Sequence, residues 1–132
     1  MIPPRFDITP AEISTVVADF YREIRRHPML GPVFARHVAD WAAHEAKIAA
    51  FWRNAILFER GYEGNPLAVH KAAGNVRPGM FPAWLGLFDE VLRRNLTEAQ
   101  ARSWSALAHR IGQGLSYGLV AQSGVPNLRG TL

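Results

Sequence analysis

The chain has 132 residues, 48% of them hydrophobic and 20% charged, a balance typical of one folded globular domain rather than of a disordered segment. The formal net charge of +4 at pH 7 makes acidic partners worth considering, but the basic doublets Arg25-Arg26 and Arg93-Arg94 lie where helices are expected to end, so nucleic-acid binding is the weaker interpretation. The absence of cysteine excludes disulfides, zinc–thiolate sites and iron–sulfur clusters.

The first long helix is marked by its start signal. Residues 9–12, with the sequence TPAE, have the form of a capping box with proline at the first helical position. We therefore expect a helix over about 10–26, which Pro28 ends. Its apolar residues recur every three or four positions and predict one buried face, which consists of Ile13, Val16, Val17, Phe20, Tyr21 and Ile24.

A short irregular segment separates this helix from a second long one. Residues 29–37 contain Gly31-Pro32 and predict a turn or a short irregular helix. Asp40 is placed to cap the next helix, which we expect to end at Gly61. The residues predicted to face inward on this helix are Trp41, His44, Ile48, Phe51, Trp52 and Ala55.

The second half of the chain predicts three further helices. Asn65-Pro66 offers a cap and a first helical residue for a short helix that carries His70. Pro82 opens a helix of about 82–95, and residues 97–100, TEAQ, form a second capping box for a last helix that runs to about Gln122.

No segment alternates apolar and polar residues as a half-buried strand would, so the expected fold class is all-α. We expect a single domain over 1–132, with an N-terminal extension over 1–8 and a C-terminal tail over 124–132. No apolar run approaches the roughly 18 residues of a membrane span, and the N-terminus lacks the pattern of a signal peptide. The sequence therefore predicts a cytoplasmic protein without membrane association.

The five histidines are the candidate metal ligands. The chain lacks the paired histidine spacings of structural zinc and di-iron centres, which argues against both. We expect helix ends or surface positions for His27, His37 and His109. His44 shares an apolar helix face with Ile48 and Phe51, whereas His70 stands alone on its short helix. Each of these two could be an ordinary hydrogen-bonded residue of the core or its boundary.

Two aromatic residues add polar atoms to inward-facing positions. Tyr21 brings a hydroxyl and Trp84 an indole N–H, and both groups need an acceptor when they are buried. Aromatic residues at helical spacing are usually only part of the core. A small polar ligand bound to a metal, however, would explain both of them together with His44 and His70.

Five segments resemble the truncated haemoglobins, and specifically their third group, in order and with similar spacing across about residues 10–120. They are DFYREI (19–24), LGPVF (30–34), WAAHEAKIAAFW (41–52), NPLAVH (65–70) and FPAWLGLF (81–88). The paired glycines of other truncated groups are absent around the distal helix, which favours the third group. The resemblance implies a truncated globin fold, in which a two-on-two helical sandwich surrounds haem b (iron protoporphyrin IX).

The resemblance also implies roles for individual residues. His70 would be the proximal ligand of the iron, and Tyr21, His44 and Trp84 would lie on the distal side. The other residues implied to line the pocket are Phe20, Phe34, Ile48 and Phe51. The candidates to meet the haem propionates are Lys47, Arg53, Lys71 and Arg77.

The function implied is binding of O2, NO, CO or another small ligand at a five-coordinate or weakly six-coordinate iron. Hydrogen bonds from the distal phenol and indole predict slow oxygen release, which favours redox chemistry such as detoxification of NO over bulk transport. A dioxygenase-like or peroxidase-like activity would need an external electron donor, since no reductase domain is attached. The alternative from another class is a cofactor-free helical interaction module that binds acidic partners, which would be colourless.

Overall fold

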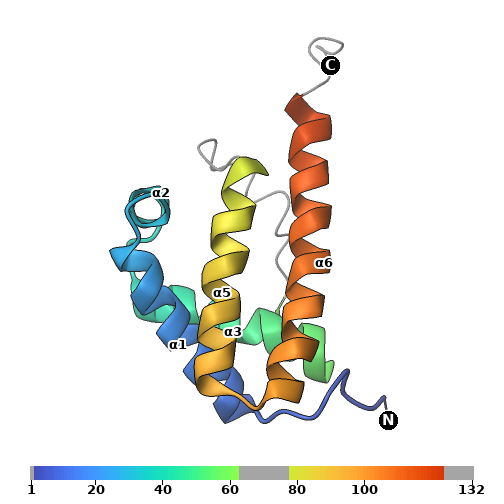
Figure 1. Cartoon of the computed structure of the whole chain (residues 1–132). Helices are drawn as coiled ribbons and strands as arrows, with labels where there is room; N and C mark the ends of the chain where they lie inside the picture. The colour runs from blue at the N-terminus through green and yellow to red at the C-terminus, as the bar shows by residue number, and fades with distance from the viewer. Residues whose placement is uncertain (1, 63–77, 124–132) are drawn as a thin grey trace.

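The described part of the chain consists of helices joined by short turns (Figure 1). A computed structural model describes residues 2–62 and 78–123. Its elements in chain order are α1 (Pro10–Arg26), α2 (Leu30–Ala35), α3 (Trp41–Leu57), the single-turn 3-10 helix η1 (Pro78–Met80), α5 (Phe81–Asn95) and α6 (Glu98–Ser123). The expected all-α fold class is confirmed.

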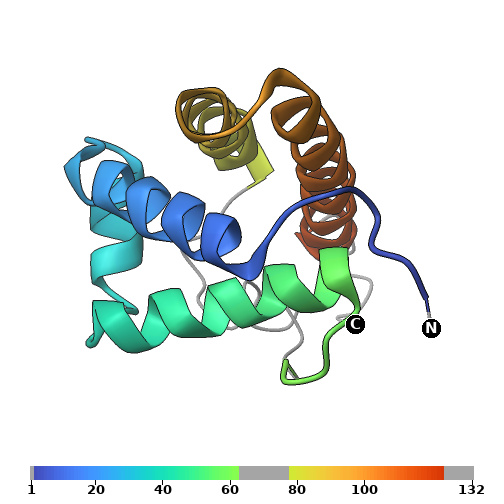
Figure 2. The same cartoon turned by 90° about the horizontal axis from the view of Figure 1, so that it is seen from below.

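The long helices form two antiparallel pairs. α1 packs along α3 in one pair and α5 along α6 in the other, and α1 also contacts α5 (Figures 1 and 2). The short helix α2 lies against α1, beside the end where α3 begins. The two pairs together enclose an apolar core, so side chains from α1, α3 and α5 can converge on one point.

Both predicted capping boxes are present. The Thr9 hydroxyl accepts a hydrogen bond from the Glu12 backbone N–H at 3.1 Å, and the Thr9 backbone N–H donates to the Glu12 carboxylate at 2.9 Å. Thr97 and Gln100 make the same pair of contacts before α6. These hydrogen bonds satisfy backbone donors that the first turn of a helix leaves unpaired.

The predicted end of the second long helix at Gly61 is wrong, because α3 ends at Leu57. Phe58 adopts the left-handed conformation with φ of 61°, and its N–H donates to the carbonyls of Arg53 and Asn54. The Asn54 side chain donates in turn to the Glu59 carbonyl at 2.8 Å. A non-glycine residue therefore takes the left-handed position that glycine usually occupies at a helix end.

The predicted buried face of α1 is confirmed, since all six of its apolar residues are buried. The predicted inner face of α3 is only partly confirmed, because Trp52 is buried whereas the other five predicted residues are partly buried. The buried residues of α3 are Ala49, Trp52 and Ile56, whereas Ile48 and Phe51 are only partly buried. α3 thus packs on the core along one face and presents a neighbouring, half-buried face that includes His44.

The segment before α1 is fastened to both helix pairs. The Arg5 backbone N–H donates to the Ile56 carbonyl at 2.9 Å, and the Arg5 guanidinium donates to the Ala55 carbonyl at 2.8 Å. The Gln100 side chain donates to the Asp7 carbonyl at 3.1 Å. This segment therefore covers the end of α3 and the start of α6. No helix in the described ranges is both long and apolar enough to cross a bilayer.

Candidate functional site

Tyr21 and His44 form the centre of the candidate site. Tyr21 lies on the buried face of α1 and is 3% exposed, and His44 lies one turn into α3. Their rings meet edge to face with centroids 4.8 Å apart. The sequence predicted both as inward-facing residues, and the antiparallel packing of α1 on α3 brings them into contact.

Two further aromatic rings surround this pair. Phe34 from α2 lies edge to face with Tyr21 at 5.7 Å and with His44 at 6.2 Å. Trp41, in the first turn of α3, lies 6.2 Å from Tyr21 and 6.1 Å from His44. Trp41 was not among the predicted site residues, although its position three residues before His44 places it on the same helix face.

Trp84 joins the site through Phe20. The Phe20 ring is edge to face with Tyr21 at 5.2 Å and with Trp84 at 5.3 Å. Trp84 lies in the first turn of α5 and is only partly buried. The structure therefore brings five predicted site residues, from α1, α2, α3 and α5, into one connected cluster of rings. They are Phe20, Tyr21, Phe34, His44 and Trp84.

Burial keeps both polar groups at the centre uncharged. Burial, with the negative charge of Glu45 as a smaller cause, raises the pKa of the Tyr21 phenol far above its ordinary range. Burial, followed by the positive charge of Lys47, lowers the pKa of His44. Tyr21 is thus an intact O–H donor, and His44 is a neutral imidazole at pH 7.

The polar atoms of this pair have free hydrogen-bonding capacity within the described structure. His44 Nε2 is buried and has no hydrogen-bond partner there. The Tyr21 side chain is almost completely enclosed, and within the described ranges its hydroxyl makes no hydrogen bond to another residue. A buried polar atom without a partner, such as His44 Nε2, is costly, and a small polar ligand would satisfy it.

The other predicted site residues lie at the edge of the ring cluster or outside the described residues. Ile48 and Phe51 follow His44 along α3 and are partly buried. His70, the predicted iron ligand, lies outside the described residues, as do Lys71 and Arg77. Of the other two propionate candidates, Lys47 is exposed and Arg53 forms an ion pair with Glu59 at 3.4 Å.

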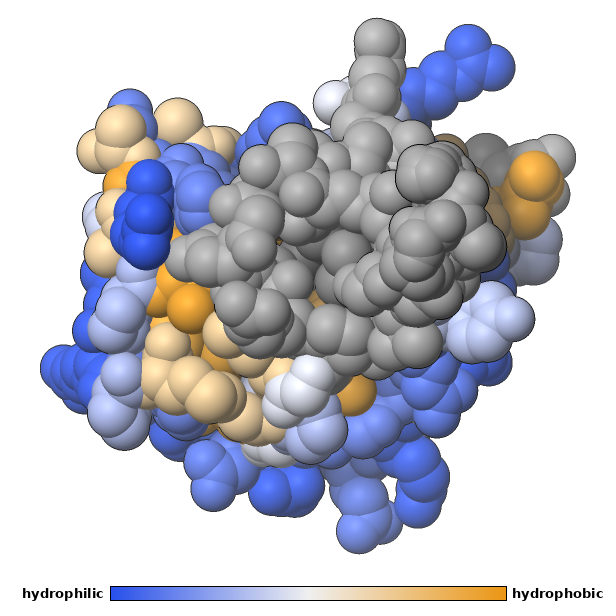
Figure 3. All heavy atoms as spheres, turned by 90° about the horizontal axis from the view of Figure 1, so that it is seen from above, coloured by the Kyte–Doolittle hydropathy of each residue, from blue (hydrophilic) through white to orange (hydrophobic). Residues whose placement is uncertain are grey.

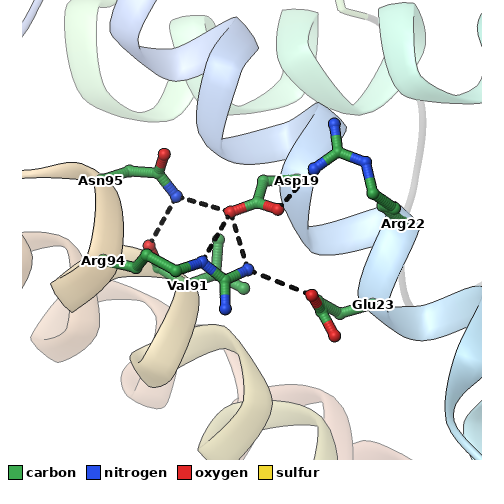
Figure 4. A network of polar contacts seen from close by, with 6 residues as sticks. All are labelled: Asp19, Arg22, Glu23, Val91, Arg94 and Asn95. Atoms are coloured by element: carbon green, nitrogen blue, oxygen red, sulfur yellow. Dashed lines mark hydrogen bonds and ion pairs between the residues drawn. The ribbon is translucent and has the colours of Figure 1, made fainter.

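A buried carboxylate on α1 fixes this helix against α5 (Figure 4). Asp19 Oδ2 accepts hydrogen bonds from Arg94 Nη2 and Asn95 Nδ2, each at 2.8 Å, and Oδ1 accepts one from Arg22 at 2.7 Å. Sequence reasoning missed this role, because it treated Arg94 as a cation that complements a helix end. Since Tyr21 lies on α1 and Trp84 on α5, the contact sets the distance between the helices that carry them.

A second polar cluster, on α5 and α6, lacks the arrangement of a catalytic triad. Ser105 donates to Asp89 Oδ1 at 2.7 Å, and His109 Nε2 lies 2.9 Å from Asp89 Oδ2. Because serine and histidine both bind the carboxylate and not each other, the histidine is not placed to activate the hydroxyl. The His109 side chain is 41% exposed, as its predicted surface position requires.

Hydrophobic residues are also visible on the outer surface. Seen from above in Figure 3, hydrophobic residues gather on the side where α2 lies, next to the residues drawn in grey, and hydrophilic residues form the rim. The helical pairs, the aromatic cluster and the neutral tyrosine–histidine pair together define a small globin-like protein.

Comparisons with known proteins agree with this class. The chain is 34% identical over 89 residues to "group 3 truncated hemoglobin ctb" of Campylobacter jejuni, a match that covers 64% of this chain and 70% of that protein. The crystal structure of the group III truncated haemoglobin from Campylobacter jejuni superposes with a TM-score of 0.82 at 29% identity, covering 86% of this chain and 92% of the other. No family model matches the sequence.

The chain belongs to the group 3 truncated haemoglobins. The resemblance stated from the sequence is confirmed, as is the truncated globin fold. Membership in a haemoglobin family implies a haem cofactor and small diatomic ligands. The orphaned His44 Nε2 and the neutral Tyr21 phenol fit such a group, because both could meet a ligand on one of its faces.

The pKa of His44 can be tested directly. In the protein without added haem, we expect His44 to titrate below 6.5, because burial and the charge of Lys47 both disfavour the imidazolium. NMR spectra of the ring protons across a pH series measure this midpoint. Lys47→Gln removes the smaller cause and should raise the midpoint slightly. A wild-type midpoint at or above 6.5 would contradict the burial argument.

Proposed function

We propose that this chain binds haem b through His70 and holds O2, NO or CO next to Tyr21, His44 and Trp84. Haem, when bound, would supply the iron that takes these ligands. The observation that carries the proposal is the contact between buried Tyr21 and half-buried His44, whose Nε2 atom is itself buried and lacks a partner within the described residues. A dry pocket strengthens each hydrogen bond that such groups make to a polar ligand.

The protonation states fix the direction of these hydrogen bonds. The Tyr21 phenol keeps its proton and donates it. The neutral His44 imidazole carries one N–H, so it can donate to a ligand only in the tautomer that protonates the nitrogen facing the pocket. Phe20, Phe34, Ile48 and Phe51 would exclude water around these donors, since all four are apolar side chains packed in or against the core.

We further propose that the ligand chemistry is redox chemistry, such as oxidation of NO or reduction of a peroxide, with electrons from an external donor. Uncharged donors in a water-free pocket retain a partly negative ligand, which suits slow turnover of a bound species better than rapid exchange. We also propose that the protein is cytoplasmic and that residues 1–132 form a single domain.

The test is the visible absorption spectrum after haem addition, for the wild type and for His70→Ala. We expect the wild type to take up haem stoichiometrically and show a sharp Soret band, whereas His70→Ala should bind haem weakly and with a shifted band. His109→Ala is the matched control, because this partly exposed histidine pairs with Asp89 outside the ring cluster. Failure of the wild type to take up haem would reject the proposal and favour the cofactor-free interaction module.

A further inference from the structure

A continuous line of aromatic rings leads away from the candidate site. Trp84 stacks on Phe88 with centroids 5.5 Å apart and planes 12° apart, and Phe88 stacks on Trp52 at 5.7 Å and 14°. Three rings from α5 and α3 therefore lie nearly parallel through the core. Phe88 is fully buried and Trp52 is 3% exposed, so these two rings are shielded from water, whereas Trp84 is partly buried.

The line continues from Trp52 to the surface. Phe51 meets Trp52 edge to face at 5.0 Å, and Tyr62 meets Phe51 edge to face at 5.1 Å. Tyr62 is partly exposed and follows the end of α3. The rings thus connect a tryptophan of the candidate site to a tyrosine that reaches solvent.

We propose that this stack is an electron path, in which Tyr62 supplies electrons through Trp52 and Trp84 when the site reduces a peroxide. The inference rests on the proposed haem-binding function. Tryptophan and tyrosine rings can lose an electron reversibly, whereas phenylalanine rings serve here as contacts that shorten the gaps between them. The path would spare the buried residues of the site from lasting oxidation.

The chemistry balances with hydrogen peroxide as oxidant and an external phenol as reductant. Reduction of one peroxide to two waters takes two electrons and two protons. In each of two transfers, Trp84 gives one electron to the site, which also takes up one proton from solvent. Trp52 then reduces Trp84, and Tyr62 reduces Trp52 while the Tyr62 phenol releases one proton to solvent. The tyrosyl radical then takes a hydrogen atom from the external phenol, which restores Tyr62 and leaves a phenoxyl radical.

Tyr62 is better suited than the other two tyrosines to end the path. Tyr21 is separated from Trp84 only by the Phe20 ring, but it is 3% exposed, so its phenol cannot exchange a proton or a hydrogen atom with solvent species as a surface tyrosine can. Tyr117 is 78% exposed, but no ring contact joins it to the stack within the described structure. Only Tyr62 combines a ring contact to the path with access to solvent.

The experiment locates the radical in the haem-loaded protein. Haem uptake is first confirmed from the Soret band. Hydrogen peroxide is then added with a nitrone spin trap (DMPO), without other reductant, and peptide mass spectrometry locates the adduct. We expect the adduct on Tyr62, and we expect it to be lost in Tyr62→Phe and retained in Tyr117→Phe. An adduct on Tyr117 or Tyr21 in place of Tyr62 would overturn the inference.

Two core variants separate the path from general damage to the core. Trp52→Phe should remove most of the Tyr62 adduct. Trp104→Phe makes the same change beside Trp52 and Phe88, which Trp104 meets edge-on, and it should retain the adduct because the parallel stack remains. Equal loss in both variants would overturn the path.

A third variant covers the case in which Trp52→Phe does not fold. Phe51→Leu interrupts the contact to Tyr62 at a partly buried position and should also lower the adduct. A wild type that binds haem and yet forms no Tyr62 adduct rejects the electron path alone. A wild type that binds no haem rejects the proposed function and the path together.

Discussion

Replacing Tyr21 by phenylalanine is expected to speed dissociation of O2 about tenfold, because the phenol contributes one hydrogen bond to the ligand and a bond of about 1.4 kcal/mol corresponds to a factor of ten. The phenylalanine ring retains the contacts with Phe20, Phe34 and His44, so the change removes little besides the hydroxyl. Stopped-flow mixing of the oxygenated protein with an oxygen scavenger measures the rate.

Trp84→Phe tests the second donor in the same way. If Tyr21 and Trp84 donate independently, the double variant should release O2 about a hundredfold faster than the wild type, and a departure from that product measures their coupling. Tyr117→Phe is the matched control, since it removes a hydroxyl from a side chain that is 78% exposed. Oxygen release unchanged in all three site variants would remove both residues from ligand binding.

Replacing Asp19 by alanine is expected to lower the free energy of unfolding by about 2–3 kcal/mol, because hydrogen bonds to a charged, buried group are among the stronger ones. The Asp19 side chain is 12% exposed, whereas those of Arg22 and Arg94 are about half exposed, so water can solvate both guanidinium groups after the change. Urea denaturation measures the difference. Asp7→Ala serves as the control, since Asp7 is exposed.

The same carboxylate predicts a pH dependence of stability. Burial would raise the pKa of Asp19, but hydrogen bonds from Asn95 and Arg94 and the charges of Arg94 and Arg22 outweigh it and hold the pKa below 3.8. The stabilisation is therefore complete above the unfolded-state pKa and is lost as the pH falls through the lower folded-state pKa.

Asp19→Asn makes this acid dependence measurable. The stability difference between the wild type and Asp19→Asn should be largest near pH 7 and shrink towards about pH 3. A difference that stays constant over this range would show that the network does not depend on the charge of Asp19. If Asp19→Asn also changes the O2 dissociation rate, the spacing of α1 and α5 affects the site.

The sequence by itself determined the features that depend on neighbouring residues. The starts of α1 and α6 were predicted because a capping box is built from a hydroxyl and a side chain only three residues later. The buried face of α1 was predicted because its apolar residues keep one helical period throughout. The resemblance to truncated haemoglobins also came from residues in sequence order, and the comparisons confirmed it.

Only the tertiary structure decided the features that depend on distant residues. Twelve of the 17 residues of α3 are apolar or aromatic, so periodicity could not select which face packs on the core. Packing against the other long helices decided that Ala49, Trp52 and Ile56 are buried. The partners of Asp19 on α5, Arg94 and Asn95, lie 75 and 76 residues away along the chain, beyond the reach of any local pattern. The same packing sets Trp41 beside Tyr21, a contact that forms only where α1 and α3 meet. It also buries His44 Nε2 without a partner in the described structure, because the surroundings of that atom depend on residues distant in the sequence.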